Sequence, residues 1–386
     1  MEVERSPIAQ LQAEREAHAS MTDKIDAMQD AFDKKLYHEL TNLMLDYLKS
    51  QEVYGLPETR FFLENFVKSF KAKLNQVRVV DLVRLASESQ ASPEDAVRLL
   101  DAWEPSGNDE ATMMWGAVKA LFLIKLGRLP EAVELLESTE KLMSAKLGLD
   151  VNVKAAFHNA LATLKKARGE LEEYYKNSLL FLAYSPLDAI PETERPKLAY
   201  NIAVAAVAAP EIFNFGELLQ QALLESLKGS EQEWILVILR AFNRGELKEF
   251  EKAVQETSAK LKQSELKDIV NTEMLHKAKL LALIEAAFRK PKTQRKLTFA
   301  EISQCSNVSN KEVEFLLMKA MSAGLLKGRI NEVKQEVQVT WVRPRILDTQ
   351  RLEVMEKRLM TWADEAKALA LRLEDSAEPE AEALAA

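Results

Sequence analysis

Residues 297–342 read LTFAEISQCSNVSNKEVEFLLMKAMSAGLLKGRINEVKQEVQVTWV, and this stretch carries two helix starts and a helix end. Thr298 and Glu301 are three residues apart, as are Ser309 and Glu312, and this spacing is typical of a capping box at the first turn of a helix. Gly324 follows the last apolar turn of the second helix. It predicts a left-handed backbone at the helix end.

Two strand patterns follow Gly324, at residues 325–330 and 333–342, with a turn at residues 331–332 between them. In the second pattern Val337, Val339 and Trp341 alternate with polar residues, as a strand that is buried on one face requires. Two capped helices followed by a hairpin predict a winged-helix fold, which we place at residues 271–347.

The second capped helix of a winged helix often lies in the major groove of DNA. Here its charged side chains, Lys311, Glu312, Glu314 and Lys319, sum to zero, and the whole chain has a formal charge of −8. A phosphate-binding surface needs several uncancelled cations. We therefore predict that the module binds no nucleic acid, and that its strands present an edge for pairing with another protein chain.

The composition indicates a mostly helical protein of several domains or repeats. A chain of 386 residues exceeds one ordinary core, and only 11 glycines and 12 prolines interrupt it. A leader pattern and an uncharged apolar run of about 18 residues are both missing, so we expect neither secretion nor membrane insertion. The single cysteine, Cys305, lies within the first capped helix and is expected to be a packing residue.

Three glycines mark helical hairpins upstream of the winged helix. An apolar helix precedes each of Gly127, Gly169 and Gly245, and an amphipathic helix follows it. Their irregular spacing predicts a degenerate helical-hairpin solenoid, similar to tetratricopeptide repeats, over residues 29–270. Such arrays present long surfaces to protein partners. Residues 1–28 are a polar N-terminal segment, either frayed or a marginal first helix.

The last predicted element is a heptad helix at residues 348–374. One seam of this helix carries apolar residues in steps of three and four, namely Leu352, Met355, Leu359, Trp362, Ala366, Leu369 and Leu373. The seam could pack on the chain's own solenoid, but its three heptads after a compact domain favour a bundle with helices of other chains. The acidic residues 375–386 are expected to be disordered.

Motifs for catalysis, metal binding or cofactor binding are missing. The sequence contains no phosphate-binding glycine loop and no zinc-binding pair of histidines, and its four histidines are far apart. We therefore predict a protein that is not an enzyme, with no catalytic, metal-binding or cofactor-binding residues. The most basic cluster, Arg289, Lys290, Lys292, Arg295 and Lys296, is read as a solvated linker, with contact to an acidic group or nucleic acid as the alternative.

Several longer stretches carry a family resemblance. Residues 212–219 read IFNFGELL and residues 339–345 read VTWVRPR, with further similarity at 241–243 and 317–320. With these stretches the chain resembles the lid subunits of the 26S proteasome that belong to the PCI family. The resemblance covers residues 34–362 and places a whole PCI region at roughly 176–345.

The resemblance implies a mostly α fold, in which a helical solenoid is followed by a winged helix and a C-terminal bundle helix. It implies a cytoplasmic and nuclear scaffold for ubiquitin-dependent degradation, joined to other PCI and lid subunits through winged-helix edges and a helical bundle, and lying near the intrinsic ubiquitin receptor. The alternatives are a PCI subunit of the signalosome or the translation initiation complex, or a nucleic-acid-binding PCI module. Residues 212–219 are the feature that favours the proteasome.

Overall fold

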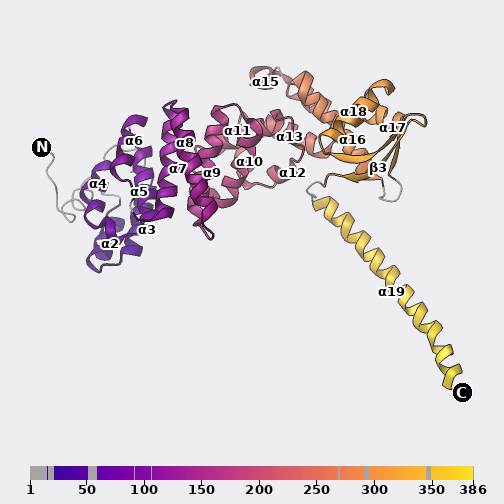
Figure 1. Cartoon of the computed structure of the whole chain (residues 1–386), viewed down its shortest axis with the longest axis horizontal. Coiled ribbons are helices and arrows are strands. Elements are labelled where there is room, and N and C mark those ends of the chain that lie inside the picture. Colours follow the sequence, from indigo (N-terminus) through magenta and orange to yellow (C-terminus); the bar gives the residue numbers. More distant parts are fainter. Residues whose placement is uncertain are drawn as a thin grey trace. The chain divides into compact units, whose positions relative to one another are not determined.

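The computed structural model describes residues 15, 21–50, 59–90, 92–105, 107–267, 270–290, 295–344 and 349–385. Contacts between residues divide the chain into two compact units, Met1–Ala209 and Pro210–Ala386. In the described part of the first unit the regular elements are all helices, and the second unit combines helices with one small sheet (Figure 1).

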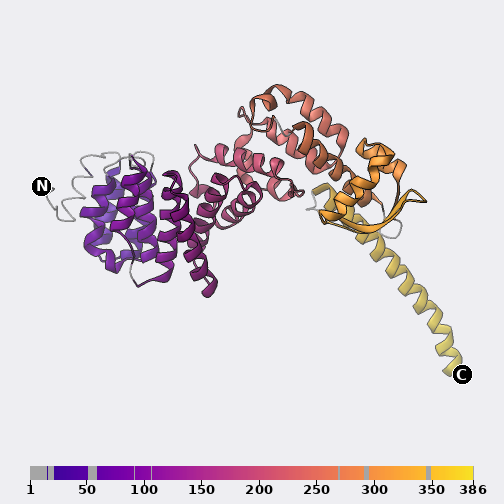
Figure 2. The ribbon, with the colours of Figure 1, turned by 45° about the horizontal axis from the view of Figure 1, so that its top comes forward.

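The first unit is a stack of helices. They are α2 (Thr22–Asp33), α3 (Tyr37–Leu48), α4 (Thr59–Asn65), η2 (Val67–Lys73), α5 (Gln76–Glu88), α6 (Pro93–Ala102), α7 (Asp109–Lys125), α8 (Leu129–Ala145), α9 (Val151–Ala167), α10 (Leu171–Tyr184), η3 (Leu187–Ala189) and α11 (Arg195–Ala208). Figure 2 shows the purple and magenta helices of this unit lying side by side.

Glycines reverse the chain between paired helices, as the sequence predicts. Gly127 and Gly169 both have φ +76°, and Gly127 N donates to Ile124 O at 3.0 Å. These left-handed turns fold α8 back on α7 and α10 back on α9. The first two of the three predicted hairpins are therefore confirmed.

The predicted boundary of the N-terminal segment at residue 28 is wrong. Helix α2 begins at Thr22, and Ile25, Met28 and Ala31 of this helix are buried in the core of the first unit. These three residues recur every three positions and so lie on one face of the helix. Burial of this face stabilises the helix although the residues between them are polar. Residues 1–14 and 16–20 lie outside the described part of the chain.

The second unit begins with short helices and ends with a long one. Its elements are α12 (Gly216–Leu219), η4 (Ala222–Leu227), α13 (Trp234–Arg244), α14 (Leu247–Glu256), α15 (Ser258–Gln263), η5 (Val270–Met274), α16 (Leu275–Arg289), β1 (Lys296–Thr298), α17 (Phe299–Ser306), α18 (Asn310–Ser322), β2 (Leu326–Asn331), β3 (Glu336–Val342) and α19 (Thr349–Ala385).

The predicted solenoid at 29–270 is divided between the two units. Its third hairpin, α13 and α14 around Gly245 with φ +74°, belongs to the second unit. Both helices contact α16, and Phe242 of α13 stacks on Phe215 with ring centroids 5.2 Å apart. This hairpin therefore packs against α16, the first helix of the winged-helix module.

The winged helix comprises α16, α17 and α18 with a three-stranded antiparallel sheet in the order β1-β3-β2. Strand β1 was not predicted, because three residues are too few to show an alternating pattern. The hairpin turn is also longer than predicted. It spans residues 332–335 instead of 331–332, and Gln335 takes a left-handed backbone with φ +48°.

Helix α19 is 37 residues long and continues to Ala385. The predicted helix end near residue 374 and the predicted disorder after it are therefore not found over residues 375–385. Alanine, glutamate and leucine make up most of this stretch, and all three favour helical backbone. Within the described ranges, no helix is both long and apolar enough to span a membrane.

Candidate interaction surfaces

The first capping box of the winged helix is formed as the sequence predicts. Thr298 N donates to Glu301 Oε2 at 2.8 Å, and Glu301 N donates to Thr298 Oγ1 at 3.3 Å. Lys290 adds its ammonium, whose Nζ lies 2.9 Å from both carboxylate oxygens of Glu301. These contacts hold the pKa of the Glu301 carboxyl below its usual range, and the hydrogen bond from Lys290 contributes most to this shift. They fix the start of α17 against β1.

The second capping box has a different hydrogen-bond pattern. Ser309 N and Ser309 Oγ both donate to Glu312 Oε2, at 3.2 and 2.9 Å, and Glu312 N donates to the backbone oxygen of Ser309 at 2.9 Å. The Ser309 hydroxyl thus acts as a donor to the carboxylate, and this bond lowers the pKa of Glu312. Helix α18 therefore starts where the sequence places it.

Gly324 ends α18 with a left-handed backbone, φ +66°, as predicted. Gly324 N donates to Met321 O and Leu325 N donates to Ala320 O, both at 3.0 Å. This pair of bonds is a Schellman motif, and the buried side chains of Leu325 and Ala320 supply the apolar contact that accompanies it. The motif directs the chain from α18 into β2.

The predicted alternation in β3 is wrong at Trp341. Lys327 of β2 pairs with Trp341, but the next residue, Gly328, pairs with Val339, so Thr340 is an extra residue in β3. This β-bulge reverses the faces beyond it. Val342 is buried and Trp341 is 40% exposed on the outer face of the sheet, with Lys327 Nζ 5.4 Å from its ring centroid.

The strands and the residue that follows β3 carry four exposed cations, Lys296, Lys327, Arg329 and Arg343. None of them forms an ion pair with another described residue. We refer to Lys327, Arg329 and Asn331, the exposed outer-face residues of β2, as the β2 edge.

Two residues of the basic cluster before β1, Arg289 and Lys290, behave differently, because acidic residues of the same unit pair with them. Arg289 pairs with Glu246 at 2.5 Å and with Glu285 at 3.5 Å, while Lys290 pairs with Glu301. Lys292 lies outside the described residues. Arg289 belongs to helix α16 and Lys296 to strand β1, so the cluster extends beyond the solvated linker that the sequence predicted. The ion pairs leave fewer of its cations for an external phosphate.

The predicted seam of α19 is exposed. Trp362 is 69% exposed, and Leu352, Met355, Leu359, Ala366 and Leu369 are exposed as well. The side chain of Leu373 lies outside the described set. A row of large apolar residues this open to water is typical of an interaction surface.

Helix α18 carries a second apolar surface, which the sequence did not single out. Phe315 is 63% exposed and Met318 is 51% exposed, one turn apart on the outer face of the helix. Their spacing matches that of core residues, and only the burial of Val313, Leu316 and Leu317 on the other side shows which face is turned to solvent.

Possible metal ligands are not gathered in the described part of the chain. No group of three or more His, Cys, Asp or Glu side chains among them could hold a metal ion. Cys305 is half-buried, its thiol donates to Ile302 O at 3.3 Å, and burial raises its pKa. These features fit its predicted packing role.

Comparison with known proteins relates both units to one family. The family model for PSD13 N-terminal repeats matches residues 24–239, and the model for the PCI domain matches residues 253–341. The 26S proteasome non-ATPase regulatory subunit 13 of Dictyostelium discoideum is 28% identical over 96% of this chain and 97% of its own length. The probable 26S proteasome regulatory subunit rpn9 of Schizosaccharomyces pombe is 33% identical over 96% of both chains.

The translation initiation complex is represented by a more distant relative. Eukaryotic translation initiation factor 3 subunit M of Coccidioides immitis is 23% identical, over 56% of this chain and 46% of its own length. The similarity to the proteasome subunits therefore spans nearly the whole chain, whereas the similarity to this translation factor spans about half.

Proposed function

Because this chain belongs to the family of 26S proteasome non-ATPase regulatory subunit 13, we propose that it is a structural, non-catalytic subunit of the lid of the proteasome regulatory particle. The observation that carries this proposal is the match of the family's N-terminal repeats over residues 24–239. A PCI domain alone would be equally consistent with a subunit of the signalosome or of the initiation complex.

The exposed seam of α19 supports assembly through a helical bundle. Its residues Leu352, Met355, Leu359, Trp362 and Leu369 are exposed to water in the single chain. Each large side chain that enters a bundle contributes about 1.5 to 3 kcal/mol. Knobs from three heptads can fill holes between partner helices. In this proposal Leu352, Met355, Leu359, Trp362, Ala366, Leu369 and Leu373 are the partner contacts.

The wing supports a second contact with a neighbouring PCI subunit. Strand β2 is at one edge of the sheet, and in the described part of the chain no further strand pairs with its outer side. An unpaired edge offers backbone donors and acceptors to a strand from another chain. The caps at Thr298, Glu301, Ser309 and Glu312 and the turn at Gly324 hold that edge in place.

Two finer assignments follow from the family resemblance alone, namely a position near the intrinsic ubiquitin receptor and a role in ubiquitin-dependent degradation in the cytoplasm and nucleus. The proposals that the chain binds no nucleic acid, cofactor or membrane rest on the charge, the motifs and the hydropathy of the sequence. The ion pairs of Arg289 and Lys290 with acidic residues support the proposal that nucleic acid is not a partner.

Affinity purification tests the proposal. The tagged full chain is expressed in its source cells and recovered at moderate salt, and the co-purifying chains are identified and quantified by mass spectrometry. We expect the other lid subunits in equal amounts. Recovery of signalosome or initiation-factor subunits in their place would refute the proteasome assignment.

A further inference from the structure

The β2 edge lies on a strand that pairs with β3 on one side only, and the side chains of this strand alternate between the two faces of the sheet. Lys327, Arg329 and Asn331 point to the exposed outer face, whereas Gly328 and Ile330 are half-buried on the other face. A strand added beside β2 would place every second side chain next to Lys327 and Arg329, and the others next to Gly328 and Ile330.

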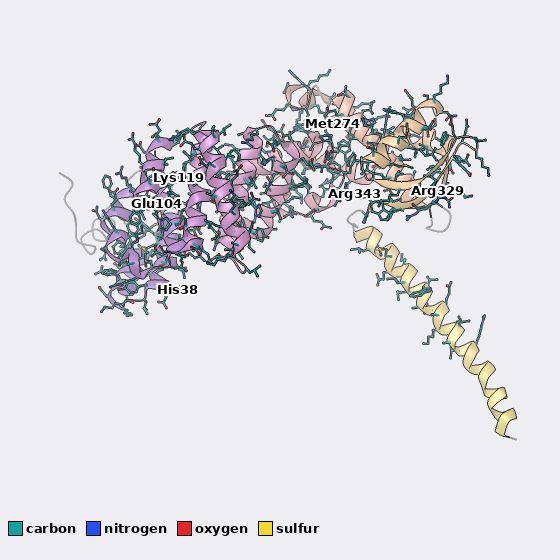
Figure 3. The ribbon with its side chains drawn as sticks, in the orientation of Figure 1. His38, Glu104, Lys119, Met274, Arg329 and Arg343 are labelled. Carbon is teal, nitrogen blue, oxygen red and sulfur yellow. The ribbon has the colours of Figure 1, made fainter. Side chains whose placement is uncertain are left out.

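The outer face beside this edge is positively charged. Lys296, Gln338 and Arg329 lie in one row across the three strands. Arg343 follows β3, and its N–H donates to Leu325 O, so its cation lies toward the end of β2 opposite Arg329 (Figure 3). Glu336 is the acid of this face, in the terminal row with Thr298 and Asn331.

This charge contrasts with the rest of the molecule. The whole chain carries −8, yet Lys296, Lys327, Arg329 and Arg343 have no acidic partner among the described residues, whereas the nearby Arg289 and Lys290 do. Cations left unpaired on one face of an acidic protein favour a negatively charged ligand there.

Two observations favour a protein strand over a single-stranded nucleic acid. Nucleic acids without base pairing bind sheets by stacking bases on several aromatic faces. Trp341 is the one aromatic residue on this outer face, and the ammonium of Lys327 already lies over its ring. An open strand edge, in contrast, needs backbone partners, which an extended peptide supplies.

We propose that the β2 edge binds an extended acidic segment of a neighbouring subunit, with carboxylates at alternate positions facing Lys327 and Arg329. The residues between the carboxylates are apolar and lie against Ile330. The inference rests on the proposed function and deepens it, because it names the chemistry of the segment that the wing joins.

A peptide assay on the isolated full chain tests the chemistry without the assembly. A fluorescein-labelled Glu-Val-Glu-Thr-Glu-Val-Glu peptide is titrated with protein, and fluorescence anisotropy reports binding at low salt and at physiological salt. We expect saturable binding that weakens at least tenfold in the variant Lys327→Glu/Arg329→Glu. The matched control is Lys311→Glu/Lys319→Glu, which makes the same change of charge on α18 and is expected to bind as the wild type does.

Three outcomes overturn the inference. The first is that the peptide does not bind, and the second is that both double variants bind equally. The third is that a labelled oligouridine of similar charge binds more tightly than the peptide and loses binding in the β2 variant. The last outcome would assign the edge to nucleic acid.

A second assay tests whether the β2 edge contributes to assembly with the other lid subunits. The two double variants are tagged and purified from cells as for the wild type. We expect Lys327→Glu/Arg329→Glu to recover several-fold less of the other lid subunits than Lys311→Glu/Lys319→Glu does, and equal recovery overturns the inference. If the wild type recovers no lid subunits, the proposed function fails, while the peptide assay still decides the chemistry of the edge.

Discussion

Gly328 lies so close to the backbone of β3 that a Cβ atom added to it would stand 2.5 Å from the carbonyl oxygen of Gln338. The same atom would be 3.1 Å from the Cα of Val339. Both neighbours are backbone atoms and cannot rotate away. The β-bulge that turns Trp341 outward therefore depends on a residue without a side chain at position 328.

The variant Gly328→Ala should destabilise the second unit. Because the strands must separate to admit a methyl group, we expect the free energy of unfolding to fall by about 1 to 3 kcal/mol. Urea titration followed by tryptophan fluorescence and circular dichroism measures it. The control is Arg329→Ala, at an exposed neighbour, and equal stability of the two variants would show that β2 and β3 are farther apart than described.

The variant Gly324→Val should weaken the joint between α18 and β2. No atom lies within 4 Å of the Cβ position, so the cost comes from the left-handed backbone alone, at about 1 to 3 kcal/mol for a β-branched residue. Gly324→Asn is the matched control, since asparagine tolerates this conformation better. Thermal unfolding should rank glycine above asparagine and asparagine above valine. Identical melting temperatures would contradict the Schellman motif.

Removal of residues 352–373 should leave both units folded, because the described side chains of α19 are exposed, and should abolish incorporation into the lid. A pair of double variants sharpens this test. Leu359→Glu/Leu369→Glu changes the seam, and Met360→Glu/Leu371→Glu changes equally exposed residues off the seam. We expect at least about tenfold lower recovery of lid subunits for the seam variant, from the lost burial of two leucines.

The stability of the second unit should depend on the protonation of Lys277. This residue is 4% exposed, its Nζ lies 5.0 Å from the ring centroid of Phe215, and burial lowers its pKa to about 7, with Glu273 opposing that shift. The unfolded lysine keeps its proton to a pKa near 10.5. Between these values the unfolded state binds more protons, so the free energy of unfolding rises with pH, by up to about 1.4 kcal/mol per pH unit.

The variant Lys277→Met should remove this pH dependence and raise stability at pH 7 and below, where the charged amine is buried at a cost. Lys277→Arg is the control, because a guanidinium keeps its charge and should destabilise the unit throughout. Urea titrations from pH 6 to 10 compare the three proteins. A difference between wild type and Lys277→Met that does not change with pH would contradict the lowered pKa.

Local features of this protein could be predicted because their partners are close in sequence. The capping pairs Thr298–Glu301 and Ser309–Glu312 are three residues apart, and the left-handed glycines satisfy helix carbonyls in the preceding turn. The seam of α19 is likewise a property of one helix. Geometry within a few residues follows from the order of side chains, so these parts of the fold and of the candidate contact surfaces were accessible without a structure.

Contacts between distant segments decided the rest. The bulge that exposes Trp341 depends on the approach of Gly328 to Gln338, and strand β1 exists because β3 pairs with it. Arg289 pairs with Glu246, which is 43 residues away in the sequence, and this contact makes Arg289 less available to an external partner. Periodicity cannot predict such pairings, since it records how residues repeat along one element and not which elements meet. The chemistry of the β2 edge, with unpaired cations on an open strand, emerged only once the chain had folded.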